Sequence, residues 1–214
     1  MIDLHTHTLF SDGVLLPTEL VRRALVMGYS AIAITDHADI SNLDFMIPRI
    51  VDACKVINSK WNIKAIPGVE LTHIPPDTIG SLADEARRLG ARIVLVHGET
   101  ITEPVPLGTN RAALNSEIDI LAHPGLIALS DILLAKKRGI CLEITTRHGH
   151  SYTNGYVASE AIKAGARLVI NTDSHQPGDL ASDDTAKRIL LGAGVSQKMI
   201  KDIFNNSRNI IKKL

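Results

Sequence analysis

The sequence predicts an α/β fold, a closed or nearly closed TIM-like (β/α)7 barrel formed by a single domain. Three observations indicate this fold. Amphipathic segments alternate with short apolar runs, seven such units can be counted, and each apolar run is followed by a histidine, aspartate or glutamate. Alternating strands and helices favour a parallel sheet with helices outside. Candidate site residues at the ends of all seven strands favour a closed ring of strands. In an open parallel sheet, ligands bind only where the order of the strands reverses.

The strands are expected at short β-branched runs that begin directly after a helix. A glycine stands at four of these junctions, Gly28, Gly90, Gly139 and Gly165, and glycine relieves the left-handed conformation that ends many helices. The starts of the runs lie roughly 20 to 30 residues apart, the length of a βα unit. The expected strands are 2–5, 31–35, 64–69, 92–96, 119–122, 140–144 and 168–171.

One barrel domain is expected to span residues 1–214, with one or two short C-terminal helices from about residue 196. The chain has 214 residues, enough for one core, and no linker or low-complexity segment divides it. Pro17, Ser81 and Ser130 suit the first turns or caps of helices. Hydrophobic residues make up 45% of the chain and aromatic residues 3%. The core should therefore be aliphatic, as in buried parallel sheets.

The composition disfavours several classes of protein. Lysine plus arginine and aspartate plus glutamate number 23 each, which gives a net charge of zero. Long nucleic acids are therefore unfavoured partners, since their binding needs basic surfaces or aromatic stacking platforms. Cys54 and Cys141 lie in apolar stretches and are expected to be buried thiols. Without a signal peptide or a long apolar stretch, a cytoplasmic protein with no membrane partner is expected.

Side chains able to bind metal follow all seven expected strands. Residues i and i+2 of a strand point to the same side, so His5 and His7 project together, as do Asp173 and His175. Each pair can chelate one ion. The other strands are followed by Asp36, His37, Glu70, His97, His123 and Glu143. Imidazole and carboxylate ligands without thiolate suit zinc, manganese or iron, and the sequence does not choose among these metals.

Five further polar residues near this face are open to more than one interpretation. Asp3 and Asp36 could orient the ligand histidines, as partners of metal-bound imidazoles do, or could be ordinary buried hydrogen-bonded groups. Glu143 could be a ligand, a partner of a ligand or a cap. His73 and His150 lie near the same face without an assigned role.

The chain resembles the polymerase and histidinol phosphatase (PHP) family of metal hydrolases. The motifs DLHTHTLFSDG, TDH, PGVE, LVHGE, AHPG and TDSH occur in the family's order between Asp3 and His175. The resemblance implies a distorted seven-stranded barrel that holds three divalent metal ions. It implies one site from His5, His7, Glu70 and Asp173, a second from Glu70, His97 and His123, and a third from Asp12, His37 and His175. Asp12 stands where some family members have histidine, and either residue can bind.

The resemblance also implies an enzyme, a metal-dependent phosphoesterase. The expected reaction is hydrolysis of a small phosphomonoester, such as histidinol phosphate, by a metal-activated hydroxide in a trinuclear site. Glu70, Asp12 and His175 are the expected catalytic residues, and Glu70 bridges two ions. No serine or cysteine nucleophile is needed.

Three cationic side chains are candidates for binding the phosphorylated substrate. Arg111 follows the fourth strand, and Arg147 and His148 follow the sixth, so both loops should open on the active face. Arginine is well suited to phosphate. These residues could equally be surface cations.

Three other functions stay open. A phosphodiesterase or exonuclease could act on dinucleotides or short oligonucleotides, which the neutral charge does not exclude. An amidohydrolase-type enzyme would cleave C–N bonds, but the bridging lysine typical of that superfamily is missing where His97 ends the fourth strand. A non-catalytic barrel subunit should be basic and should lack several ligands. This chain is neutral and keeps them.

Overall fold

Seven parallel strands stand around a common axis in the computed structural model, which describes residues 1–214. Neighbouring strands follow the order β1-β2-β4-β5-β6-β7-β8, and the short β3 pairs with β4 beyond the end of β2. All of these pairs are parallel. The strands are β1 (Ile2–Asp3), β2 (Ala31–Ile34), β3 (His37–Ala38), β4 (Lys64–Leu71), β5 (Ile93–His97), β6 (Ile120–Ala122), β7 (Cys141–Thr145) and β8 (Leu168–Asn171). The predicted distorted (β/α)7 barrel is confirmed.

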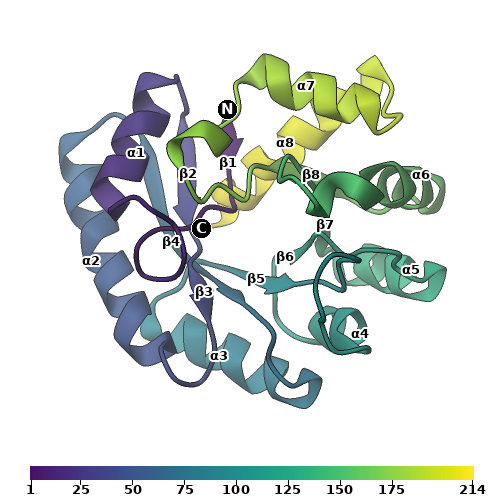
Figure 1. Cartoon of the computed structure of the whole chain (residues 1–214), viewed down its shortest axis with the longest axis horizontal. Coiled ribbons are helices and arrows are strands. Elements are labelled where there is room, and N and C mark those ends of the chain that lie inside the picture. Colours follow the sequence, from purple (N-terminus) through teal and green to yellow (C-terminus); the bar gives the residue numbers. More distant parts are fainter.

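Helices surround the strands on the outside (Figure 1). Three of them, α3, α5 and α6, end at the expected glycines, and Gly90, Gly139 and Gly165 all adopt a left-handed conformation. The α-helices are α1 (Pro17–Val26), α2 (Leu43–Lys60), α3 (Ile79–Leu89), α4 (Thr109–Asn115), α5 (Leu129–Arg138), α6 (Asn154–Ala164), α7 (Asp183–Gly192) and α8 (Gln197–Lys213). Short 3₁₀ helices are η1 (Pro76–Thr78), η2 (His150–Thr153) and η3 (Pro177–Asp179). No helix is both long enough and apolar enough to cross a membrane.

Two apolar clusters lie on the two sides of the sheet. The larger contains 48 buried residues and joins the outer faces of the strands to the helices. The smaller contains 11 buried residues, ten from the strands and Leu4 directly after β1. Alternation along each strand separates the two sets: Ala31 and Ala33 of β2 belong to the smaller cluster, whereas Ile32 and Ile34 belong to the larger.

The inward-facing row of each strand changes character toward the C-terminal end. On β4 the row starts with Ile66 and reaches Glu70, and on β5 it runs from Ile93 through Leu95 to His97. The apolar members form the barrel interior, and the polar members gather above it. This is the face where barrels of this kind carry their active sites.

Side chains assist the closure between β1 and β8. Only one isolated parallel bridge, Thr6 to Ser174, joins the two strands. The Asp3 carboxylate accepts hydrogen bonds from the backbone N–H and the hydroxyl of Thr172, at 3.1 and 2.5 Å. Asn171 Oδ1 accepts a hydrogen bond from the backbone N–H of Leu4 at 2.9 Å. Asp3 therefore closes the barrel and does not orient a ligand imidazole, which was one of its two interpretations.

Helix α8 covers the N-terminal end of the barrel. Its Ile210 and Ile211, together with Leu214, pack against the smaller apolar cluster, and Figure 1 shows the helix passing behind the strands. A helix begins at Gln197, where the sequence predicted one or two short helices from about residue 196, but it is longer than expected. A single helix of 17 residues forms because no glycine or proline interrupts this segment.

Candidate metal centre

A small pocket opens among the C-terminal ends of the strands. Its volume is about 260 Å³, and none of its 11 lining residues is hydrophobic. The lining residues are Asp12, His37, Thr72, His73, His97, Glu103, His123, Arg147, His150, Asp173 and His175. His5, His7 and Glu70 lie beneath them and are fully or almost fully buried.

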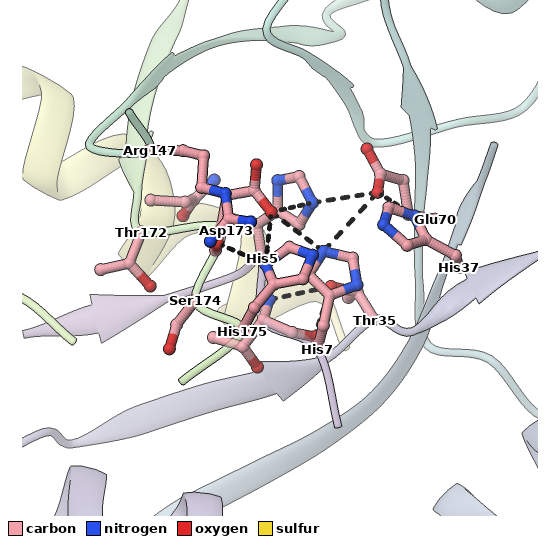
Figure 2. A network of polar contacts seen from close by, with 12 residues as sticks. His5, His7, Thr35, His37, Glu70, Arg147, Thr172, Asp173, Ser174 and His175 are labelled. Atoms are coloured by element: carbon pink, nitrogen blue, oxygen red, sulfur yellow. Dashed lines mark hydrogen bonds and ion pairs between the residues drawn. The ribbon is translucent and has the colours of Figure 1, made fainter. Parts of the chain in front are cut away.

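The first predicted ligand set converges beneath the pocket. His5 Nε2 lies 3.2 Å from Glu70 Oε2, and His7 Nε2 lies 3.1 Å from Asp173 Oδ1. The crossed distances, His5 to Asp173 and His7 to Glu70, are 3.6 and 3.7 Å. Two donor atoms bound to one ion at about 2.0–2.2 Å lie roughly 3 to 3.5 Å apart. The four side chains, which point toward one another in Figure 2, can therefore share an ion.

The third predicted set meets at the outer edge. Asp12 Oδ1 lies 3.5 Å from His37 Nε2 and 3.2 Å from His175 Nε2. The His7 ring lies against both histidines, with ring centroids 4.1 and 4.2 Å away. Donor atoms of His7, Asp12, His37 and His175 all lie within 4.8 Å of one another. The structure thus brings the predicted trio together and adds His7 to it.

The second predicted set is less compact. Glu70 Oε1 lies 3.4 Å from His123 Nε2, while Glu70 Oε2 faces His5. The two oxygens of Glu70 thus face different groups, as a bridging carboxylate requires. The rings of His97 and His123 have centroids 4.3 Å apart. The compact group that contains them, within 4.8 Å, includes His150 as its third member.

Several buried polar atoms at the centre have no hydrogen-bond partner. They include Nε2 of His5 and His7, both carboxylate oxygens of Glu70 and Oδ1 of Asp173. An unpaired buried polar atom costs free energy, and native structures rarely leave several together. Divalent ions would pair with all of these atoms at once, so the donor set fits metal ions.

The pKa values of Glu70 and His7 suit metal binding, whereas the pKa of His5 is raised. Burial would raise the pKa of the Glu70 carboxyl, but His5 and His37 outweigh it and hold the pKa well below its usual range. Burial and the neighbouring imidazoles of His37 and His5 hold the pKa of His7 well below its ordinary value. An ionised carboxylate and a neutral imidazole are the forms that bind metal.

Hydrogen bonds on the far nitrogens orient several imidazoles. His5 Nδ1 bonds to Glu143 Oε1 at 2.9 Å, and His175 Nδ1 bonds to the backbone oxygen of Asp173 at 2.9 Å. His37 Nδ1 bonds to Thr72 Oγ1 at 2.7 Å and also lies 2.9 Å from Glu70 Oε2. Glu143 also accepts hydrogen bonds from the backbone N–H of His123 and the side chain of Asn171. Both of its oxygens are occupied, so Glu143 has the arrangement of a residue that orients the candidate ligands, not that of a candidate ligand.

Asp36 acts on a loop, not on an imidazole. Its carboxylate accepts hydrogen bonds from the backbone N–H and hydroxyl groups of both Thr8 and Ser11. Gly13 packs so closely beside this loop that a Cβ atom there would lie 2.5 Å from the backbone oxygen of His7. Asp36 and Gly13 thus hold the loop that carries Asp12 over the centre.

The three predicted substrate-binding cations lie in different places. Arg147 lines the pocket, and its Nη1 donates to Asp179 Oδ2 at 3.0 Å. Arg111 does not line the pocket, because α4 turns it outward to pair with Asp131. His148 is exposed and lines a neighbouring pocket of about 520 Å³, which shares Arg147 with the first.

Glu103 is a pocket residue that the sequence analysis missed. It lies in the loop between β5 and α4, where no strand periodicity indicates which side chains face inward. Its carboxylate contacts His73, His97 and His150 at 2.9, 3.2 and 3.3 Å. Two of these histidines had no assigned role. An acidic residue in a loop after a ligand-bearing strand was the one available signal.

A sequence model of the PHP domain family matches residues 3–153. The chain belongs to the PHP domain family. Over 99% of both chains, this PHP domain is 48% identical to an uncharacterized protein of Methanocaldococcus jannaschii. It is 23% identical to a probable phosphatase of a Thermoanaerobacter species, over 94% of this chain and 89% of that protein.

Other relatives are similar over parts of their length or in fold alone. The DNA polymerase/3'-5' exonuclease PolX of Bacillus subtilis is 27% identical over 81% of this chain, which spans only 34% of that protein. The Lactococcus lactis histidinol phosphate phosphatase, solved with zinc, L-histidinol and phosphate, shares the fold with a TM-score of 0.63 and 18% identity, over 91% of this chain and 94% of that chain. Aspergillus niger ochratoxinase has a TM-score of 0.66 at 12% identity, over 99% and 71%. These structural likenesses support the barrel fold.

Proposed function

We propose that this PHP domain is a metal-dependent phosphoesterase that hydrolyses a small phosphomonoester at a trinuclear centre. The observation that carries the proposal is the set of unpaired buried donor atoms on His5, His7, Glu70 and Asp173. Such a set suits divalent ions and little else. The probable phosphatase among the relatives, and the Lactococcus enzyme solved with L-histidinol and phosphate, support a phosphomonoester substrate.

The nine proposed ligands divide into three groups with different tasks. His5, His7, Glu70 and Asp173 would hold one ion, Glu70 would be shared with a second ion bound by His97 and His123, and Asp12, His37 and His175 would hold a third. When bound, divalent ions neutralise the phosphate oxygens, lower the pKa of a coordinated water to about 7 and stabilise the leaving oxygen. Zinc, manganese and iron all suit these donors.

Glu70, Asp12 and His175 are the proposed catalytic residues. Glu70 would serve two ions at once, and burial of the whole carboxylate excludes water that would compete for it. Asp12 and His175 lie at the solvent edge, where the ester enters, and the Asp12 side chain is 57% exposed. This pair would orient the outer ion toward the incoming phosphate.

Arg147 is the proposed anchor of the phosphate group. It is the one arginine that lines the pocket, and Asp179 fixes one of its terminal nitrogens while the rest of the guanidinium can still donate. Arg147→Ala should raise KM about tenfold or more, since a charge-assisted hydrogen bond contributes about 1.5–3 kcal/mol. Arg138→Ala is the matched control, because Arg138 pairs with Glu117 away from the pocket. Equal KM values in the two variants would show that Arg147 does not bind the phosphate group.

Release of inorganic phosphate tests the reaction. The full chain is stripped of metal, reconstituted with zinc or manganese and incubated with a panel of phosphomonoesters that includes histidinol phosphate. We expect phosphate release that a chelator abolishes and that His97→Ala reduces by at least a hundredfold. A protein that binds metal but cleaves no phosphate ester would refute the proposed reaction.

Phosphodiester hydrolysis is the second candidate. The similarity to PolX, named as a 3'-5' exonuclease, and a shorter match to the 5'-3' exoribonuclease of Haemophilus influenzae favour it. Dinucleotides tested in the same assay, with a phosphatase added to release the phosphate, separate the two reactions. Cleavage of dinucleotides without release from any monoester would replace the first candidate by the second.

A further inference from the structure

Three polar side chains outside the nine proposed ligands meet above His97 and His123. Glu103 lies in the loop after β5, His73 in the loop after β4, and His150 at the start of η2. Glu103 Oε2 lies 2.9 Å from His73 Nε2 and 3.2 Å from His97 Nε2, while Glu103 Oε1 lies 3.3 Å from His150 Nε2. One carboxylate thus touches three imidazoles.

His150 has the arrangement of an oriented metal ligand. Its Nδ1 bonds to the hydroxyls of Thr100 and Thr102, at 2.9 and 3.2 Å. This leaves Nε2 facing the centre, within 4.8 Å of the donor atoms of His97 and His123. The ring is stacked on His123 with 4.2 Å between centroids, and the residue is 9% exposed. Metal-ligating histidines almost always have a hydrogen-bond partner on the other nitrogen.

The position of Glu103 also suits a ligand. Its distances to His97 and His150 fall in the range of roughly 3 to 3.5 Å expected for donors that share an ion. His97 Nδ1 is occupied by the backbone oxygen of Gly98, so its Nε2 is the nitrogen available to metal. Glu103 and His97 Nε2, which contact each other in the structure, would therefore both bind this ion.

The backbone at His73 supports a functional role for this cluster. His73, His123 and Asp173 are the only non-glycine residues with positive φ, at 52°, 25° and 53°. Such conformations cost of order 1–3 kcal/mol and concentrate at functional sites. Two of the three residues are proposed ligands. The third directs its imidazole at Glu103.

We propose that Glu103 and His150 complete the coordination of the ion held by Glu70, His97 and His123, and that His73 positions Glu103. The inference rests on the metal centre of the proposed function. The ion then has five protein donors instead of three. It should be bound more tightly than a three-donor site allows, and the loop between β5 and α4 becomes part of the metal centre.

Metal binding without substrate tests this inference. The metal-free full chain is titrated with zinc in a calorimeter, and bound zinc is counted by mass spectrometry after dialysis. Glu103→Gln keeps the shape of the side chain, and His150→Ala removes the imidazole. We expect each substitution to weaken the binding of one zinc ion by about tenfold to a hundredfold and to leave the others unchanged.

Matched controls come from the same loops. Glu99→Gln removes a carboxylate four residues before Glu103, where Glu99 caps the backbone of Gly108 and Asn110 away from the pocket. Ser151→Ala changes the residue that follows His150. The Ser151 hydroxyl makes no hydrogen bond. Both should bind zinc like the wild type. Wild-type zinc affinity in Glu103→Gln and His150→Ala would overturn the inference and leave the cluster as an ion-pair network at the pocket mouth.

Cobalt substitution gives a second readout. The visible absorption of bound Co²⁺ depends on the number and kind of its ligands, so His150→Ala should change the spectrum and Ser151→Ala should not. If His150→Ala does not fold, the Thr100→Val, Thr102→Val double variant replaces it, because this variant keeps the imidazole but removes the hydrogen bonds to Nδ1. It should lower the affinity for one zinc ion by a smaller factor than His150→Ala. A wild-type spectrum and affinity in that variant would count against the inference. Normal zinc binding without phosphate release would refute only the proposed reaction.

Discussion

Two buried glutamates with the same exposure have different tasks because their surroundings differ. Glu70 and Glu143 are both 0% exposed and both lie on inward rows of their strands. Glu143 has donors on both oxygens, from His5, His123 and Asn171. Glu70 has none. Hydrogen bonding, and not burial, therefore separates the proposed ligand from the residue that orients a ligand.

Replacing Glu143 by glutamine should weaken metal binding without unfolding the chain. Glutamine keeps one acceptor but removes the charge that fixes the ring and proton of His5. The expected loss of metal affinity is about tenfold to a hundredfold, measured by calorimetry. Glu117→Gln, at an exposed carboxylate that pairs with Arg138, should bind metal like the wild type. Equal affinities in the two variants would show that His5 needs no charged partner.

The sequence predicted the residues that strands carry better than those that loops carry. His97 ends an inward row whose period of two is visible in the sequence, and the structure places it at the pocket. Arg111 and Arg147 both follow strands, yet only Arg147 faces the pocket, because α4 turns Arg111 toward Asp131. Glu103 was missed for the same reason. Loop side chains have no periodicity from which their direction can be inferred.

At the level of elements, the junction of β1 and β8 differs from the others, because only an isolated bridge joins these two strands. Asp3 spans it through Thr172, and burial raises the pKa of the Asp3 carboxyl to about 6. Between the ordinary carboxyl pKa of about 3.9 and this value, the folded chain binds more protons than the unfolded chain. The Asp3 contribution to the free energy of unfolding therefore falls as the pH rises through that interval.

Thr172→Val should destabilise the fold, and more so at neutral than at acidic pH. The substitution leaves Oδ2 of a buried carboxylate without a donor, which costs about 1–3 kcal/mol when the carboxylate is charged. At pH 5 Asp3 is largely protonated in the folded chain, so the loss should be smaller than at pH 7.5. Urea unfolding of the metal-free protein measures both values, with the exposed Thr18→Val as the control. The same loss at both pH values would contradict the role assigned to Asp3.

Element boundaries were predictable where a local signal exists. Glycines in the left-handed conformation end α3, α5 and α6 at the expected positions. Strand β3 was not expected, since its two residues follow Asp36 after a break in the β2 run. Its pairing with β4 depends on tertiary contacts rather than on sequence pattern. Likewise, the junction through Asp3 and Thr172 joins residues 169 positions apart, which no local pattern indicates.

At the scale of the whole molecule, packing should protect both cysteines, Cys54 between α2 and the sheet and Cys141 in the barrel interior. Burial raises the pKa of the Cys54 thiol to about 12 and that of Cys141 to about 11. The folded chain then keeps thiol protons that the unfolded chain releases near its ordinary pKa of about 8.5–9, so the free energy of unfolding should fall as the pH rises from 9 to 11. A thiol reagent at pH 8 should modify the unfolded chain at least a hundredfold faster than the native chain. Comparable rates would mean that the packing around the two cysteines opens readily.

Metal ions should stabilise the whole barrel, because the proposed ligands come from both ends of the chain. His5 and His7 follow the first strand and Asp173 and His175 the last, so an ion that they share also holds the β1–β8 junction closed. A ligand at a hundred times its Kd stabilises the folded state by about 2.7 kcal/mol, which corresponds to a rise in Tm of roughly 5–10 °C for a chain of this size.

The measurement is the Tm in chelator and in a graded excess of zinc or manganese. In the metal-free chain, burial would lower the pKa of His5, but the Glu143, Glu70 and Asp173 carboxylates outweigh it and raise the pKa well above its usual value. Metal must therefore displace protons, and the rise in Tm should be larger at pH 8 than at pH 6. Asp173→Asn should show a smaller rise than Asp119→Asn, whose carboxylate pairs with Arg87 outside the centre. A Tm that is the same in chelator and in excess metal would mean that no ion bridges the first and last strands.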